Sequence, residues 1–125
     1  MTLDELQRSE YVRAAKWNSS ERQLVLSEVL GLSLTEQILA AEEQVADGKA
    51  AQIFDIAQRS IAGEPLAYSL GVSYFDGLKL AIHHEVLIPR PDTETLVEVA
   101  SAVIVRQNIQ SIHDLCTGSG AVALA

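Results

Sequence analysis

The stretch "YFDGLKLAI", Tyr74–Ile82, contains the clearest strand and turn signals in the chain. Asp76-Gly77 suits a two-residue type I′ turn, because both central residues of that turn take positive φ. After the turn, apolar residues alternate with other residues at the period of a half-buried strand. This apolar set is Leu78, Leu80 and Ile82. Because an isolated hairpin is only marginally stable in water, we expect it to pack against a neighbouring element.

On the N-terminal side, residues 1–63 contain no proline and carry apolar residues at helical spacing. We expect a bundle of four helices, the first running from about Leu3 to about Asn18. Two capping pairs are expected to start the second and third helices, and three glycines to end the last three. The pairs are Ser20 with Gln23 and Ser33 with Glu36, and the glycines are Gly31, Gly48 and Gly63. The apolar stripe of the last helix is Ile53, Ala57 and Ile61.

On the C-terminal side, "IPRPDTE", Ile88–Glu94, interrupts the strand pattern. Two prolines hold Arg90 in an extended conformation, in which it can pair with Glu94. The alternative is a helix-initiating linker with solvated charges. Asp92 or Thr93 is then expected to cap a helix. The apolar stripe of this helix is Leu96, Val97, Ala100, Val103 and Ile104.

In the last segment, "DLCTGSGAVALA", Asp114–Ala125, a turn with two glycines follows a short apolar run. We expect a short strand over Ser111–Cys116, a turn at Gly118 and Gly120, and then the start of a helix. Glycines let a backbone approach a ligand closely, and a helix N-terminus favours negative charge. An ordinary strand-to-helix corner would explain the same residues, and Cys116 occupies the first glycine position of the dinucleotide-binding pattern.

Composition narrows the function classes. The chain has 125 residues, 48% of them hydrophobic, and a net charge of −8. Such an acidic chain is not expected to bind nucleic acid, because nucleic-acid binders carry a basic face. One cysteine excludes an internal disulfide, and no segment is typical of a signal peptide or a membrane span, so we expect a cytoplasmic protein. Without a cluster of Cys and His residues, we expect no metal site.

Three stretches together resemble one enzyme family in their order and spacing. They are "GEPLAYSLGVSYFDGLKL" (Gly63–Leu80), "VLIPRPDTETLVE" (Val86–Glu98) and "DLCTGSGAVALA" (Asp114–Ala125). The family is the protein-(glutamine-N5) methyltransferases that modify class I peptide chain release factors, the PrmC/HemK family. The resemblance covers residues 63–125, while residues 1–62 agree as a helical bundle of suitable length.

The resemblance implies an α+β chain in three parts. Residues 1–63 form a helical substrate-recognition domain, and residues 64–91 form a β-hairpin linker. Residues 92–125 form the start of a Rossmann-like methyltransferase domain, with its first helix, first strand and glycine loop. S-adenosylmethionine then lies on Cys116, Thr117, Gly118, Ser119 and Gly120. The implied reaction methylates the side-chain amide nitrogen of the glutamine in the Gly-Gly-Gln motif of class I release factors.

The sequence departs from the family pattern in length. The family's Asn-Pro-Pro-Tyr segment is missing, since the 125 residues contain no Asn-Pro pair, so no catalytic residue is assigned. We therefore expect a truncated chain that is inactive alone and does not bind S-adenosylmethionine tightly. Apolar residues left uncovered are expected to favour self-association. They are Ile109, Ile112, Leu115 and Val122.

Two other functions stay open. The chain can be a non-catalytic fragment that only binds a release factor. It can also derive from an amino-methyltransferase that acts on another protein or on nucleic acid. The acidic composition and the "LIPRPDTE" segment argue against this last function.

Overall fold

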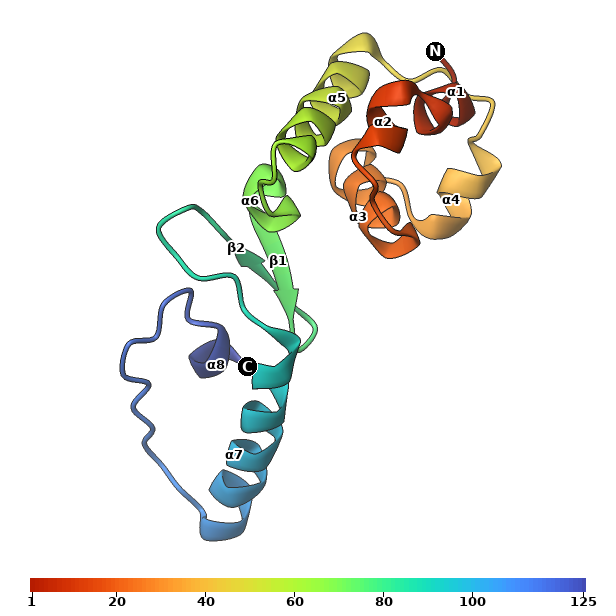
Figure 1. Ribbon diagram of the computed structural model, residues 1–125. Coiled ribbons are helices and arrows are strands. Elements are labelled where there is room, and N and C mark those ends of the chain that lie inside the picture. Colours follow the sequence, from red (N-terminus) through yellow and green to blue (C-terminus); the bar gives the residue numbers. More distant parts are fainter. The chain divides into compact units, whose positions relative to one another are not determined.

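The computed structural model describes all residues 1–125, and the chain forms two compact units, Met1–Leu70 and Gly71–Ala125. Figure 1 shows helices together with a single two-stranded sheet. The expected α+β class is therefore confirmed at the level of helices plus an antiparallel hairpin.

The first unit consists of six helices around one core (Figure 1). They are α1 (Leu3–Arg8), α2 (Glu10–Ala14), α3 (Ser19–Leu30), α4 (Leu34–Leu39), α5 (Asp47–Ile61) and α6 (Leu66–Leu70). The predicted first helix is wrong in its extent, because the helix is interrupted at Ser9 and continues as a separate helix, α2. There the Ser9 side chain accepts a hydrogen bond from the Val12 N–H and starts α2. The most deeply buried side chains of the core are Leu3, Leu6, Val25, Ile53 and Ala57.

Capping boxes start three of these helices. The predicted Ser33–Glu36 box of α4 is confirmed. The predicted Ser20–Gln23 pair is wrong, because Asn18 caps α3 and the Glu21 carboxylate accepts from the Asn18 N–H at 2.8 Å. Asn is at least as good an N-cap as Ser, and a carboxylate interacts favourably with the helix N-terminus. Gly31, at φ 75°, ends α3 as predicted.

The helix predicted to run as far as Gly48 ends at Leu39 instead. The segment that follows is held by the N-terminal residues: the Leu3 N–H donates to the Glu43 carbonyl, and the Val45 N–H donates to the Met1 carbonyl, both at 3.0 Å. These non-local bonds compete with continued helix, and Gly48 lies inside α5.

Removing the Ser33 hydroxyl is expected to raise the pKa of Glu36. The Ser33 Oγ and N–H donate to the Glu36 carboxylate at 2.6 and 2.8 Å, and these bonds lower its pKa from the ordinary value of 4.5. A lowered folded-state pKa stabilises the fold above the unfolded-state pKa, and this contribution is lost as the pH falls through the folded-state pKa. An NMR titration of Glu36 in Ser33→Ala checks the prediction. An unchanged Glu36 pKa would contradict it, and Thr2→Ala is the control that should leave Glu36 unaffected.

The second unit contains β1 (Val72–Phe75), β2 (Leu78–Ala81), the 3-10 helix η1 (Pro91–Thr93), α7 (Glu94–Gln107) and α8 (Ala121–Leu124). Phe75 pairs with Leu78 across the predicted two-residue turn, where Asp76 and Gly77 have φ of 47° and 76°. The turn and the alternation along β2 are confirmed. The buried hydrophobic residues of this unit are Phe75, Leu80, Ile82, Val97 and Ala121.

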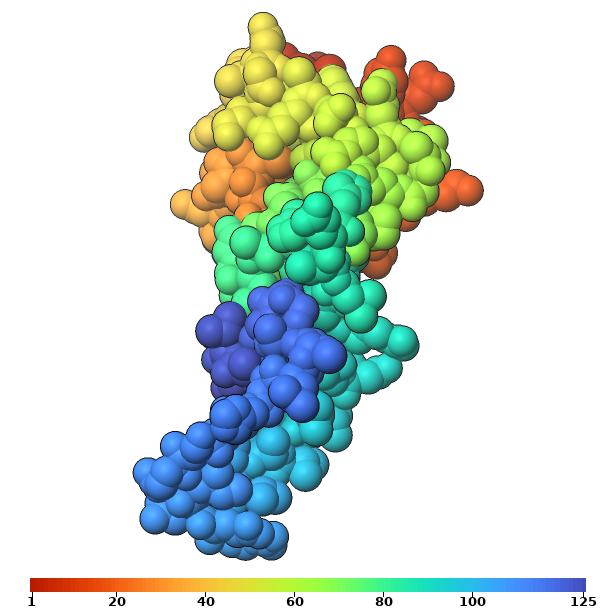
Figure 2. All heavy atoms as spheres, turned by 90° about the vertical axis from the view of Figure 1, so that its left-hand side faces the viewer, coloured from red at the N-terminus to blue at the C-terminus, as the bar shows by residue number.

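The strand predicted over Ser111–Cys116 is wrong, because these residues are in no strand. A strand needs a hydrogen-bonded neighbour, and the only sheet of this chain is the β1–β2 hairpin. Figure 2 shows the blue residues of this segment on the surface of the second unit.

Among all the helices, none has the length and apolar character that a membrane span needs.

Candidate functional site

The candidate site is the glycine loop, Cys116–Gly120, which leads into α8. Positive φ values alternate along it, with Cys116 and Gly118 both at 58° and Gly120 at 80°. This backbone suits glycine, and at Cys116 a side chain is accommodated at a cost of about 1 kcal/mol. The predicted glycine turn is therefore present, and its first left-handed position is the one that Cys116 occupies.

Hydrogen bonds within the segment fix the ends of the loop. The Thr117 Oγ1 donates to the Asp114 Oδ2 at 2.7 Å, and the Gly120 N–H donates to the Thr117 carbonyl at 2.9 Å. The backbone N–H groups of Gly118 and Ser119 have no partner within the protein. These two donors are thus available to a ligand.

A cavity of about 270 Å³ lies beside the loop. Cys116–Ser119 form one wall, and Phe75, Ile88 and Arg90 contribute to the other. The structure thus brings together the end of the hairpin, the "IPRPDTE" segment and the glycine loop. The sequence pattern identified these segments separately. It did not indicate that Phe75 and Ile88 line the same cavity, because this depends on the path of the chain between the hairpin and η1.

Of the two interpretations of "IPRPDTE", the structure agrees with the helix-initiating linker whose charges are solvated. Arg90 pairs with Asp92, at 3.5 Å between Nη2 and Oδ2, and both side chains are exposed. The Glu94 carboxylate instead accepts a hydrogen bond from the Asp76 N–H at 2.9 Å. The Arg90–Glu94 pair is therefore not formed, because Glu94 on α7 holds the hairpin turn. Thr93 precedes α7 without a side-chain capping bond, so the predicted side-chain cap at this helix is also wrong.

The histidines of the chain lie outside this cavity. His83 and His84 are exposed and follow β2 rather than lie on it, and the His83 Nδ1 accepts from the Glu85 N–H at 3.3 Å. His113 contributes to a different cavity, described next. No group of three or more His, Cys, Asp or Glu side chains in the chain has the arrangement of a metal site.

A second cavity, of about 490 Å³, lies between α7 and the C-terminal segment. Its walls are mainly apolar and include Leu96, Ile104, Ile112 and Leu124. Of the apolar stripe predicted for α7, only Val97 is buried. Ala100, Val103 and Ile104 are half-buried and Leu96 is exposed, so the face of α7 that the sequence pattern marks as core is only partly covered in this chain.

Amide hydrogens of residues 107–125 are expected to exchange with solvent roughly a hundredfold faster than those of α3 and α5. Residues 108–113 are all exposed and form no regular element, whereas α3 and α5 supply most of the buried core of the first unit. Hydrogen–deuterium exchange with mass spectrometry measures both regions in one sample. Equal protection of the two regions would contradict the prediction.

Comparisons with known proteins agree on one family. The family model described as "PrmC N-terminal domain" matches residues 7–71. The release factor glutamine methyltransferase of Bradyrhizobium diazoefficiens is 40% identical over 119 residues, covering 91% of this chain and 40% of the relative. That of Burkholderia pseudomallei is 38% identical over 117 residues, covering 94% and 41%. That of Aliivibrio fischeri is 48% identical over 84 residues, covering 67% and 29%. The chain spans about 40% of the length of the first two relatives.

Proposed function

Because the chain belongs to the PrmC N-terminal domain family, we propose that it serves S-adenosylmethionine-dependent methylation of class I peptide chain release factors. The methylated atom is the N5 nitrogen of the glutamine in the Gly-Gly-Gln motif. One observation carries the proposal: the "IPRPDTE" segment and the glycine loop border the same cavity, in a chain whose relatives are named release factor glutamine methyltransferases.

The proposed division of labour follows three segments. Residues 1–63 hold the release factor, residues 64–91 link, and residues 92–125 begin a Rossmann-like methyltransferase domain. The helical segment has a well-buried core of its own, as a rigid docking domain requires. The hairpin is tied to α7 through the bond between Asp76 and Glu94, which supports its role as a structured connection.

The glycine loop fits one side of the cofactor. Cys116, Thr117, Gly118, Ser119 and Gly120 would hold it, and the free N–H groups of Gly118 and Ser119 are suitable donors. When bound, S-adenosylmethionine supplies the methyl group from its sulfonium. The cavity of about 270 Å³ is slightly below the usual range for small-molecule sites, about 300–1,000 Å³. This supports weak cofactor binding by these 125 residues alone.

Catalysis by the isolated 125-residue polypeptide is not part of the proposal. The sequence has no Asn-Pro pair with which to hold the substrate amide, and the glycine loop has no strand neighbours. Ligand crevices in α/β proteins form at the carboxyl ends of several adjacent strands.

The reducing environment that suits a single unpaired cysteine supports a cytoplasmic location.

A chimera tests the reaction. This chain replaces the aligned part of the Bradyrhizobium diazoefficiens relative, and transfer of labelled methyl groups to a class I release factor is measured. We expect activity, and we expect Gly118→Val to reduce it about a hundredfold, because a β-branched side chain is strained at φ 58° and displaces the loop. The exposed Arg106→Gln is the matched control. A well-folded chimera without activity would overturn the proposal.

A release-factor-binding fragment without catalysis is the second candidate. It is supported by the contrast between the buried core of the first unit and the exposed Ile112, Leu115 and Leu124 of the second. Calorimetry on the 125-residue chain tests this candidate by titrating a release factor and S-adenosylmethionine in separate experiments. The candidate requires that the release factor binds and that S-adenosylmethionine shows no measurable binding. Micromolar cofactor binding would contradict it.

The exposed apolar side chains also support self-association, which sedimentation at increasing concentration detects.

A further inference from the structure

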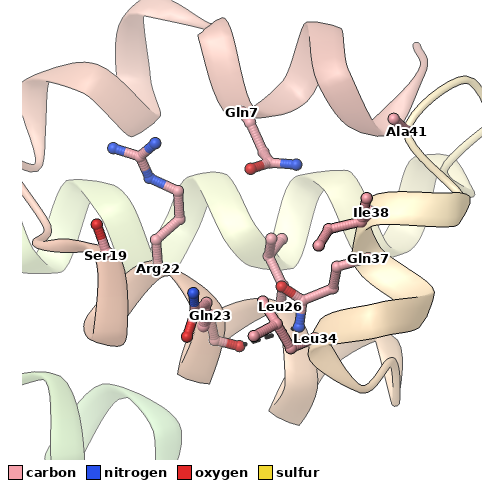
Figure 3. A pocket seen from close by; sticks show the side chains of 9 residues that line it. All are labelled: Gln7, Ser19, Arg22, Gln23, Leu26, Leu34, Gln37, Ile38 and Ala41. Carbon is pink, nitrogen blue, oxygen red and sulfur yellow. Dashed lines mark hydrogen bonds between the residues drawn. The ribbon is translucent and has the colours of Figure 1, made fainter.

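A cavity of about 330 Å³ lies in the first unit, among α1, α3 and α4 (Figure 3). Gln7 from α1 and Arg22 from α3 extend into the same space, as Figure 3 shows. Leu34 and Ile38 line it from α4. The cavity therefore has a polar side and an aliphatic side, and it shares no residue with the glycine loop.

Arg22 is the one charged residue that lines this cavity. Its Nε is buried and has no hydrogen-bond partner, and no ion pair engages its guanidinium. A buried donor without a partner destabilises a protein, so the Nε–H of this half-buried arginine is suited to an external acceptor.

Gln37 holds the α4 wall of the cavity in place. Its side chain is only 6% exposed, and its Nε2 donates to the Leu32 carbonyl at 2.9 Å and to the Ser27 Oγ at 3.1 Å. The next residue along α4, Ile38, remains 70% exposed. The frame is thus fixed by internal bonds, while Ile38 and Arg22 are left to contact a ligand.

We propose that this cavity binds a partner protein through an acidic side chain next to a branched aliphatic side chain. The carboxylate accepts hydrogen bonds from the Arg22 guanidinium, which matches carboxylate geometry. The aliphatic group covers Leu34 and Ile38 and removes their apolar surface from water. A single arginine matches the one charge of a carboxylate, whereas phosphate-bearing segments are recognised by clusters of arginines. The site does not depend on methyl transfer.

NMR titration of the full 125-residue chain tests the proposal. The probe is the dipeptide N-acetyl-Leu-Glu-amide, and N-acetyl-Leu-Gln-amide is its neutral counterpart. We expect the Arg22 Nε–Hε signal and the backbone signals of Gln7 and Ile38 to shift, with a Kd on the order of 1 mM. Arg22→Met is expected to weaken binding about tenfold. The control Arg13→Met removes an exposed arginine from α2 of the same unit and should leave binding unchanged.

A second variant keeps the test decisive if Arg22→Met does not fold. Ile38→Ser alters a mainly exposed side chain and is expected to weaken binding about threefold through lost apolar contact. Equal affinity for the neutral dipeptide would overturn the proposal. So would an Arg22 Nε–Hε signal that does not move at saturating peptide, because water would then satisfy this donor.

Discussion

Replacing Ile53 by alanine is expected to lower the free energy of unfolding of the first unit by about 3 kcal/mol. Ile53 on α5 is 1% exposed and belongs to the core cluster with Leu3, Leu6 and Val25. Truncation removes buried methyl groups and leaves a cavity that closely packed neighbours cannot fill. Chemical denaturation, followed by far-UV circular dichroism, measures the change.

The same helix offers a matched control. Ile61 is also an isoleucine of α5 but is 51% exposed, so Ile61→Ala is expected to change the stability by at most about 0.5 kcal/mol. Similar effects of the two substitutions would contradict the buried face assigned to α5. The prediction that Ile61 shares the core stripe of Ile53 and Ala57 is wrong, because Ile61 itself, the last residue of the helix, is about half exposed.

Phe75→Ala is expected to unfold the second unit. Phe75 is 1% exposed, and only Leu80, Ile82, Val97 and Ala121 are also buried hydrophobic residues there. Loss of a buried phenylalanine costs about 3–5 kcal/mol, which is comparable to the whole stability expected for 55 residues. The amide signals of residues 71–125 should collapse to random-coil positions, while those of α3 and α5 persist.

Tyr74 provides the comparison within the same strand. It lies on the opposite face of β1 and is 49% exposed. Tyr74→Ala is therefore expected to cost about 1 kcal/mol and to leave the second unit folded. A second unit that stays folded in Phe75→Ala would contradict the prediction, and unfolding by both variants would show that its stability does not depend on the buried face alone.

Features with short-range causes were predictable from the sequence. The Asp76-Gly77 turn, the Gly31 helix end and the Ser33–Glu36 box each depend on residues within a few positions of one another. Their backbone conformations follow from local hydrogen bonds and from the freedom of glycine. Asn18 was missed as a cap although its signal was present, with Glu21 three residues later.

Features with long-range causes were not predictable. The helix predicted to reach Gly48 ends early, because the Val45 N–H bonds to the Met1 carbonyl. The strand predicted over Ser111–Cys116 is lost, because no neighbouring strand accompanies it. The glycine loop itself was located correctly, since it depends on local glycines. Its walls at Phe75 and Ile88 depend on the path of the chain between the hairpin and α7, which periodicity does not encode.

The thiol of Cys116 gives this protein a reporter in the proposed site. It is the one cysteine of the chain, it is exposed, and it stands at the first left-handed position of the glycine loop. A maleimide dye will therefore label the loop alone, without any engineered substitution. The rate of that labelling reads out how open the loop is, and a ligand that covers the loop will slow it.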